Sequence, residues 1–124
     1  MQHRDKIILQ KIVKEIDSAI KFLGDISQEI FLQDELLQNA ESMIAIKVGE
    51  FVKNLTQEFR ENHKEVSWKQ AAGFRDIIAH KYETLEMENV YLRIKEDFPE
   101  LKKQIEEILE NEQKSVRGGK NVDD

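Results

Sequence analysis

The chain has 124 residues, a length that fits one domain with a single hydrophobic core. Charged residues make up 35% of it and hydrophobic residues 40%, with five glycines and one proline, a composition that favours helices with charged outer faces. The absence of cysteine excludes disulfides, thiolate metal sites and a cysteine nucleophile. No apolar run approaches membrane-spanning length, and residues 1–5 lack the apolar core of a signal peptide, so we expect a cytoplasmic protein.

The formal net charge of -6 argues against general binding of nucleic acids. The charge is unevenly distributed along the chain, however. Residues 1–46 carry net -3 and residues 82–124 carry net -5, whereas residues 47–81 carry net +2. The positive surplus therefore lies in the segment that leads up to Arg75 and His80.

The first predicted helix runs from about Arg4 to Leu23, where Gly24 is placed to end it. Its apolar residues recur at helical spacing: Ile8, Ile12, Ile16, Ile20 and Leu23. Residues 25–33 are predicted to form a connector or a short helix, for which Ser27 is a candidate cap.

A second long helix is predicted from near Asp34 to about Phe59, because a wide apolar stripe follows that segment. Gly49 interrupts the stripe. Glycine inside a helix costs roughly 1 kcal/mol relative to alanine. We therefore expect a close helix crossing at Gly49.

Residues 60–66 are polar and predict a loop. Ser67 then offers an N-cap, and Gln70 completes a capping-box pattern for a short helix from Trp68 to about Ala79.

Thr84 is a candidate cap for the last long helical segment. Pro99 is expected either to kink that segment or to start a new helix. The fold class predicted from these patterns is all-α, an antiparallel up-and-down bundle of four to five helices. We expect the bundle to occupy residues 1–111 and a flexible tail to occupy residues 112–124.

The short helix carries the residues with the clearest chemical potential. The guanidinium of Arg75 is a planar, permanently charged fork suited to phosphate oxygens, and the imidazole of His80 can donate or accept a proton near neutral pH. Together they suit metal-independent cleavage of RNA, in which a base activates the ribose 2′-hydroxyl and an acid protonates the leaving oxygen. No metal-binding spacing of His and acidic residues occurs, so we expect neither a metal nor a cofactor.

Arg75 and His80 point about 140° apart on an ideal helix, and they converge more easily if that helix ends near Ala79. One histidine does not easily supply both proton transfers, so we predict a homodimer with a composite site. A simpler interpretation stays open. In it, His80 only interacts with the helix dipole and Arg75 forms a surface ion pair.

Arg75, His80 and Tyr82 form the pattern Arg-x4-His-x-Tyr, which resembles the signature of HEPN domains and, more narrowly, of HepT-like toxins. The resemblance covers residues 4–109. Further stretches match in order and spacing: Leu36–Ala40, Val48–Glu50, Trp68, Gly73 and Asp97–Leu101.

This resemblance implies a helical-bundle dimer that acts as an endoribonuclease toxin of a type VII-like toxin–antitoxin pair. Arg75 and His80 take the catalytic positions, and Asp76 takes the polar position after the arginine, which is often Asn in the family. Tyr82 matches the tyrosine to which a partner, a minimal nucleotidyltransferase antitoxin, attaches AMP. The glycine that commonly follows this tyrosine is absent here, where Glu83-Thr84-Leu85 continues.

The substrate implied by the resemblance is RNA, with tRNA and mRNA both open. The alternative is a non-catalytic subunit that binds a nucleotide or the nucleotidyltransferase without cleaving RNA. A third hypothesis is an inert helical interaction protein.

Overall fold

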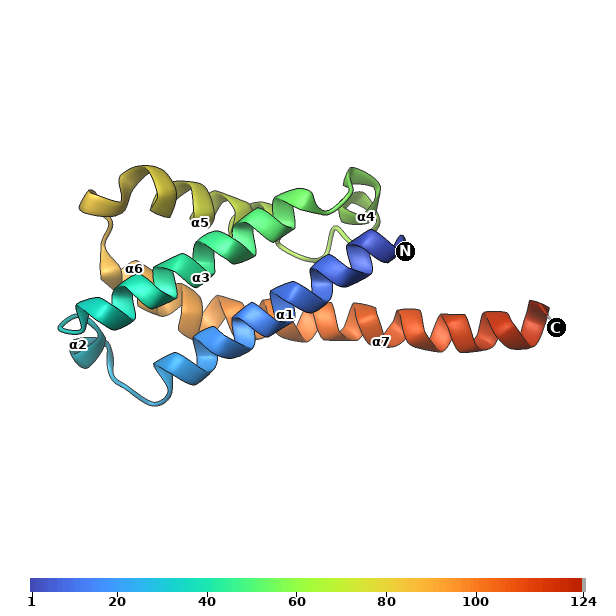
Figure 1. The fold of residues 1–124 in the computed structure, drawn as a ribbon, viewed down its shortest axis with the longest axis horizontal. Helices are drawn as coiled ribbons and strands as arrows, with labels where there is room; N and C mark the ends of the chain where they lie inside the picture. The colour runs from blue at the N-terminus through green and yellow to red at the C-terminus, as the bar shows by residue number, and fades with distance from the viewer. Residues whose placement is uncertain (124) are drawn as a thin grey trace.

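The structure, a computed structural model, describes the backbone of residues 1–123 and the side chains of residues 1–114. Within this part the chain is helical and contains no strand, which confirms the predicted all-α bundle (Figure 1). The helices are α1 (His3–Leu23), α2 (Gln28–Phe31), α3 (Glu35–Asn54), α4 (Gln57–Asn62), α5 (Trp68–Lys81), α6 (Met87–Leu92) and α7 (Phe98–Asp123). A 3-10 turn, η1 (Tyr82–Thr84), follows α5, and a π-helical turn, η2 (Arg93–Asp97), joins α6 to α7.

The long helices α1, α3 and α7 form the body of the bundle, with α1 packed against both of the others. Helix α5 lies along α3, and the two share the most extensive contact between elements of the fold. The core is built from aliphatic residues spaced three or four apart on each helix, such as Ile12 and Ile16 of α1, Val48 and Val52 of α3 and Ile105 of α7. Helix α3 thus packs against α1 and also against α5.

The predicted second helix ends at Asn54 and not near Phe59. Leu55 adopts an extended backbone, and the Thr56 hydroxyl accepts a hydrogen bond from the Phe59 amide at 3.2 Å, which starts the separate helix α4. Asp5 of α1 stabilises this break, because its buried carboxylate accepts hydrogen bonds from the amide and the hydroxyl of Thr56 at 2.9 and 2.7 Å. Helix α4 also replaces the first part of the loop expected over residues 60–66.

Of the four expected caps, Ser27 and Gly24 are confirmed, Ser67 is confirmed in position only, and Thr84 is wrong. Ser67 stands at the N-cap position of α5, but its side chain makes no capping hydrogen bond, and α5 continues to Lys81. Thr84 lies inside η1, where its hydroxyl donates to the Lys81 carbonyl, and α6 begins only at Met87. By contrast, Ser27 accepts the Ile30 amide as expected, and Gly24 ends α1 with a positive φ of 54°.

Pro99 is the second residue of α7, and only Phe98 separates it from the π-helical turn η2. A proline in a helix lacks an amide donor and its ring crowds the preceding turn, and the wider π turn accommodates both. The chain thus passes from α6 through η2 into α7 with helical backbone at each junction.

The division into a bundle over residues 1–111 and a flexible tail over residues 112–124 remains a prediction. The backbone of α7 is helical as far as Asp123, but residue 124 and the side chains of residues 115–124 lie outside the described part. No described helix combines the length and the apolar character that crossing a membrane requires.

Candidate functional site

The crossing of α3 over α5 positions the candidate site. A Cβ added at Gly49 would lie 2.2 Å from the Arg75 Cβ and 2.9 Å from the Ala71 carbonyl oxygen. Any side chain at this position would therefore push the two helices apart. The close crossing predicted at Gly49 is confirmed, and it places Arg75 directly against α3.

Arg75 is held between two carboxylates. Its Nε atom lies 2.9 Å from the Glu50 carboxylate of α3, although the N–H does not point at that oxygen as a hydrogen bond requires. Its Nη1 atom donates to Asp76 at 3.1 Å. The second terminal nitrogen, Nη2, makes no hydrogen bond within the described residues. With the side chain 25% exposed, that nitrogen is what the guanidinium still offers to an incoming phosphate.

Asp76 connects Arg75 to a second cation. The Lys53 ammonium of α3 lies 2.5 Å from the same Asp76 oxygen that Arg75 contacts. Hydrogen bonds from Lys53 first and from Arg75 second hold the pKa of the Asp76 carboxyl below its usual value. Lys53, Asp76, Arg75 and Glu50 therefore form a chain of alternating charges along the seam between the two helices.

His80 lies in the last turn of α5 and is exposed. Within the described residues it makes no hydrogen bond and no ion pair. Since α5 persists to Lys81, the helix does not end near Ala79, and His80 stays about 140° around its axis from Arg75. One copy of the chain thus presents the two groups on different sides of the same helix.

Tyr82 is the first residue of η1, immediately after α5. Its hydroxyl donates a hydrogen bond to the side-chain oxygen of Asn39, near the start of α3. The residue is 38% exposed, so part of it is open to solvent.

Sequence reasoning assigned no role to three residues that contact the predicted ones. Asn39, Glu50 and Lys53 all lie on the α3 face that meets α5, where they contact Tyr82, Arg75 and Asp76 respectively. Their separations of 11 and 14 residues return to nearly the same side of an α-helix. That spacing indicates, from sequence alone, that the three side chains lie on one face of the helix.

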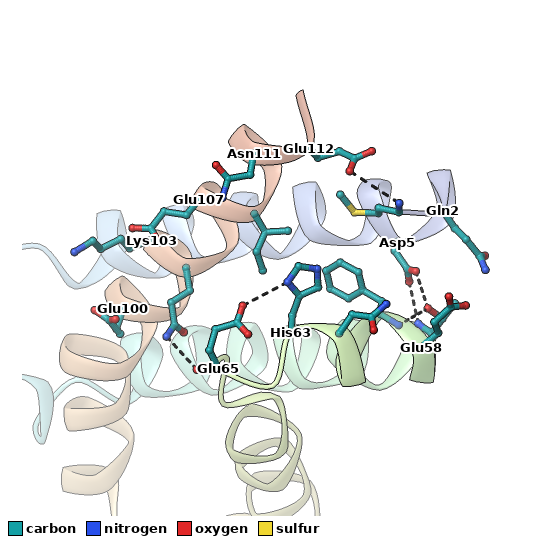
Figure 2. A pocket seen from close by; sticks show the side chains of 16 residues that line it. Gln2, Asp5, Glu58, His63, Glu65, Glu100, Lys103, Glu107, Asn111 and Glu112 are labelled. Carbon is teal, nitrogen blue, oxygen red and sulfur yellow. Dashed lines mark hydrogen bonds and ion pairs between the residues drawn. The ribbon is translucent and has the colours of Figure 1, made fainter. Parts of the chain in front are cut away.

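A cavity with a volume of about 830 Å³ lies elsewhere, between the start of α1, the helix α4 and α7 (Figure 2). Its acidic lining residues are Asp5, Glu58, Glu65, Glu100, Glu107 and Glu112. His63 lines it as well, with its ring 4.5 Å from that of Phe59 and its Nδ1 atom 3.4 Å from Glu65. None of the predicted site residues borders this cavity. Carboxylates repel phosphates, so it does not suit RNA.

No cluster of three or more His or acidic residues that could hold a metal ion occurs in the described part of the chain. The polar groups gathered at the α3–α5 seam are cations, carboxylates, an amide and a phenol. They suit contacts to phosphate and proton transfer.

Comparison with known proteins identifies the family. The model of the family described as "Ribonuclease HepT-like" matches residues 12–108. The chain belongs to the HepT-like ribonuclease family. This confirms the resemblance drawn from the Arg75–Tyr82 pattern.

The chain is similar to several curated members of the family. It is 39% identical over 104 residues to a candidate RNase of Caldanaerobacter subterraneus subsp. tengcongensis, covering 84% of this chain and 93% of that protein. It is 31% identical over 108 residues to a candidate ribonuclease HepT of Thermococcus cleftensis, covering 87% and 98%. A candidate RNase of Methanocaldococcus jannaschii is also 31% identical, over 107 residues, covering 86% and 98%. No solved structure matches the chain.

Proposed function

We propose that this protein is a metal-independent endoribonuclease, the toxin of a type VII-like toxin–antitoxin pair. The observation that carries the proposal is the α3–α5 seam of a HepT-like chain. There, Arg75 is anchored by Glu50 and Asp76 while His80 stands exposed in the last turn of the same helix. The proposed substrate is RNA, with tRNA and mRNA both open, and the proposed place of action is the cytoplasm.

The proposed chemistry needs no cofactor. His80 takes the proton of a ribose 2′-hydroxyl, and that oxygen attacks the adjacent phosphorus. The bond from phosphorus to the 5′-oxygen breaks as an acid protonates the leaving oxygen, which gives a 2′,3′-cyclic phosphate and a free 5′-hydroxyl. Arg75 stabilises the charge that develops on the phosphoryl oxygens, and Asp76 orients Arg75.

A homodimer with a composite site supplies the second proton-transfer group. In it, His80 of one copy acts as base and His80 of the other copy acts as acid. Two exposed apolar side chains, one on α5 and one on α3, give such a dimer surface to bury. Ile77, one turn before His80, is 49% exposed, and Met43 of α3 is 54% exposed.

The proposed regulation is the addition of AMP to Tyr82 by a minimal nucleotidyltransferase antitoxin. The Tyr82 oxygen attacks the α-phosphorus of ATP, the bond to pyrophosphate breaks, and the phenolic proton leaves to solvent. The adduct places an anionic phosphate two residues from His80, where it repels RNA and competes for Arg75. The partial exposure of Tyr82 supports access by the partner.

Cleavage of RNA in the presence of EDTA tests the proposal. We expect protein free of AMP to cleave RNA, and His80→Ala to lower the rate by about 100-fold or more, because general acid–base groups contribute roughly 10²–10⁴ in rate. His3→Ala is the matched control, since His3 lies at the start of α1 and should leave the rate unchanged. If wild-type protein and His80→Ala cleave equally, the proposal is wrong.

The alternative is a non-catalytic subunit that binds the nucleotidyltransferase or a nucleotide. The net charge of -6 and the engagement of Arg75 by two carboxylates favour it. It predicts tight association with the nucleotidyltransferase and no RNA turnover even after AMP has been removed from Tyr82.

A further inference from the structure

The segment that carries His80 has few contacts with the rest of the bundle. Residues 79–84 are all exposed, and the chain packs against the core again only from Leu85 onward. Figure 1 shows this end of α5 and the start of α3 at the same end of the molecule. Segments with few buried contacts open easily, so whatever holds this one decides where His80 lies.

The hydrogen bonds of residues 79–86 are local, with one exception. The Thr84 hydroxyl donates to the Lys81 carbonyl, and the Leu85 amide donates to the Tyr82 carbonyl. The exception is the bond from the Tyr82 hydroxyl to the Asn39 side chain, which crosses from η1 to α3. Among the residues with described side chains, Asn39 is thus the only side chain that ties this segment to another helix by a hydrogen bond or ion pair.

We propose that Asn39 is a positioning residue of the active site. It accepts the Tyr82 hydroxyl and thereby holds the end of α5, with His80, against α3 in the arrangement that cleavage requires. This inference rests on the proposed function and names a residue of α3 that controls it.

The same contact gives the proposed modification a second way to act. When AMP is attached to the Tyr82 oxygen, the phenolic proton is gone and the oxygen no longer donates to Asn39. The end of α5 is then released, in addition to any repulsion that the phosphate exerts on RNA. The Tyr82–Asn39 bond is therefore a switch between an ordered and a released His80.

Hydrogen exchange and steady-state kinetics together test this switch. A hydrogen bond between neutral groups shifts a local equilibrium by about threefold to tenfold. We expect Asn39→Ala and Tyr82→Phe each to speed amide exchange in residues 79–86 by that factor, with residues 68–74 unchanged. In AMP-free protein, kcat should fall by a similar factor with KM changed less than twofold, and the double variant should fall no further.

Two variants distinguish loss of the Tyr82–Asn39 hydrogen bond from general damage to α3. Asn39→Asp keeps an acceptor at the same reach and should restore kcat, while its added charge raises KM for RNA. Gln38→Ala removes the neighbouring side chain, which donates to the Phe31 carbonyl of α2 and does not contact η1. It should leave kcat and exchange in residues 79–86 unchanged.

The outcomes distinguish this inference from the proposed function. If His80→Ala abolishes cleavage but Asn39→Ala matches Gln38→Ala in kcat, the positioning role is wrong and the ribonuclease stands. If amide exchange in residues 79–86 is the same in all variants, the Tyr82–Asn39 hydrogen bond does not hold this segment, whether or not RNA is cleaved. If AMP-free wild-type protein does not cleave RNA, the positioning role falls with the proposed function, and the exchange rates still decide whether Asn39 holds the segment.

Discussion

Glu41 of α3 is the most unusual single residue in the fold. Its side chain is 0% exposed, and neither carboxylate oxygen has a hydrogen-bond partner among the described residues. Burial raises the pKa of the Glu41 carboxyl to about 8, so the group is largely neutral at pH 7. The neighbouring Ser42 hydroxyl is also buried without a partner in that part of the chain.

A substitution at Glu41 should change how the stability of the protein depends on pH. The folded pKa of about 8 lies above the ordinary value of 4.5, so between these values the folded state holds a proton that the unfolded chain has lost. The resulting stabilisation is complete below about pH 4.5 and is lost as the pH rises to about 8. Glu41→Gln should match the wild type near pH 4.5 and exceed its free energy of unfolding by about 3 kcal/mol at pH 7, at 1.36 kcal/mol per pKa unit.

Urea denaturation at pH 4.5, 6, 7 and 8 measures this difference. Glu110→Gln is the control, because it removes an exposed carboxylate from α7 and should follow the wild-type dependence on pH. Equal slopes for wild type and Glu41→Gln would mean that the Glu41 carboxyl is ionised in the folded protein.

Sequence reasoning did not single out Glu41, because an acid in a charged helix usually lies on its solvated face. The spacing offered a signal. Glu41 precedes Ala45, Val48 and Val52 by 4, 7 and 11 residues, which places it on their buried side of the helix. The helical period, if it had been applied to Glu41 as well as to the apolar residues, would have indicated that this side chain is buried.

At the scale of elements, sequence patterns predicted both ends of α1 and of α5 to within two residues, but they failed at the end of α3. The apolar stripe continues through Leu55 to Phe59, and Thr56, although it is a residue type that caps helices, lies within that stripe. Asp5, which lies 51 residues away in sequence, accepts hydrogen bonds from Thr56 and so stabilises the break. A tertiary contact of this kind overrides local pattern and is invisible to it.

The α3–α5 crossing allows two glycines to be compared. Gly49→Ala places a methyl group against the Arg75 Cβ and the Ala71 carbonyl, so α5 must shift. We expect a loss of about 1–3 kcal/mol in the free energy of unfolding, as for other overpacked contacts. Gly73→Ala meets nothing within 4 Å and should stabilise α5 by up to about 1 kcal/mol through helix propensity.

Thermal and urea denaturation of the two variants measure these opposite effects. RNA cleavage adds a second reading, since a displaced α5 also moves Arg75 away from Glu50. Equal stability of Gly49→Ala and Gly73→Ala would show that the helices do not depend on this close approach.

At the scale of the whole molecule, the motif Arg-x4-His-x-Tyr located the candidate site, and the helical period did not. The motif named Arg75, Asp76 and His80, which lie in the second half of α5, and Tyr82, which directly follows α5 in η1. Their partners on α3 were missed because pairing between helices depends on the crossing at Gly49, which a single sequence locates but does not orient. The geometry of one chain also leaves Arg75 and His80 on different sides of α5, and this is the strongest physical reason to propose a second copy.

Subunit mixing tests the composite site. Wild-type protein is mixed with a growing excess of His80→Ala protein under conditions that exchange subunits, and RNA cleavage is measured per wild-type chain. If one cleft needs His80 from both copies, each mixed dimer is inactive, and activity per wild-type chain falls toward zero as the excess grows. If each chain carries a complete site, the activity per wild-type chain stays constant. Sedimentation shows that dimers form, and capture of untagged chains by affinity-tagged ones shows that subunits exchange. His3→Ala protein added in the same excess should leave the activity per wild-type chain unchanged, since it keeps His80.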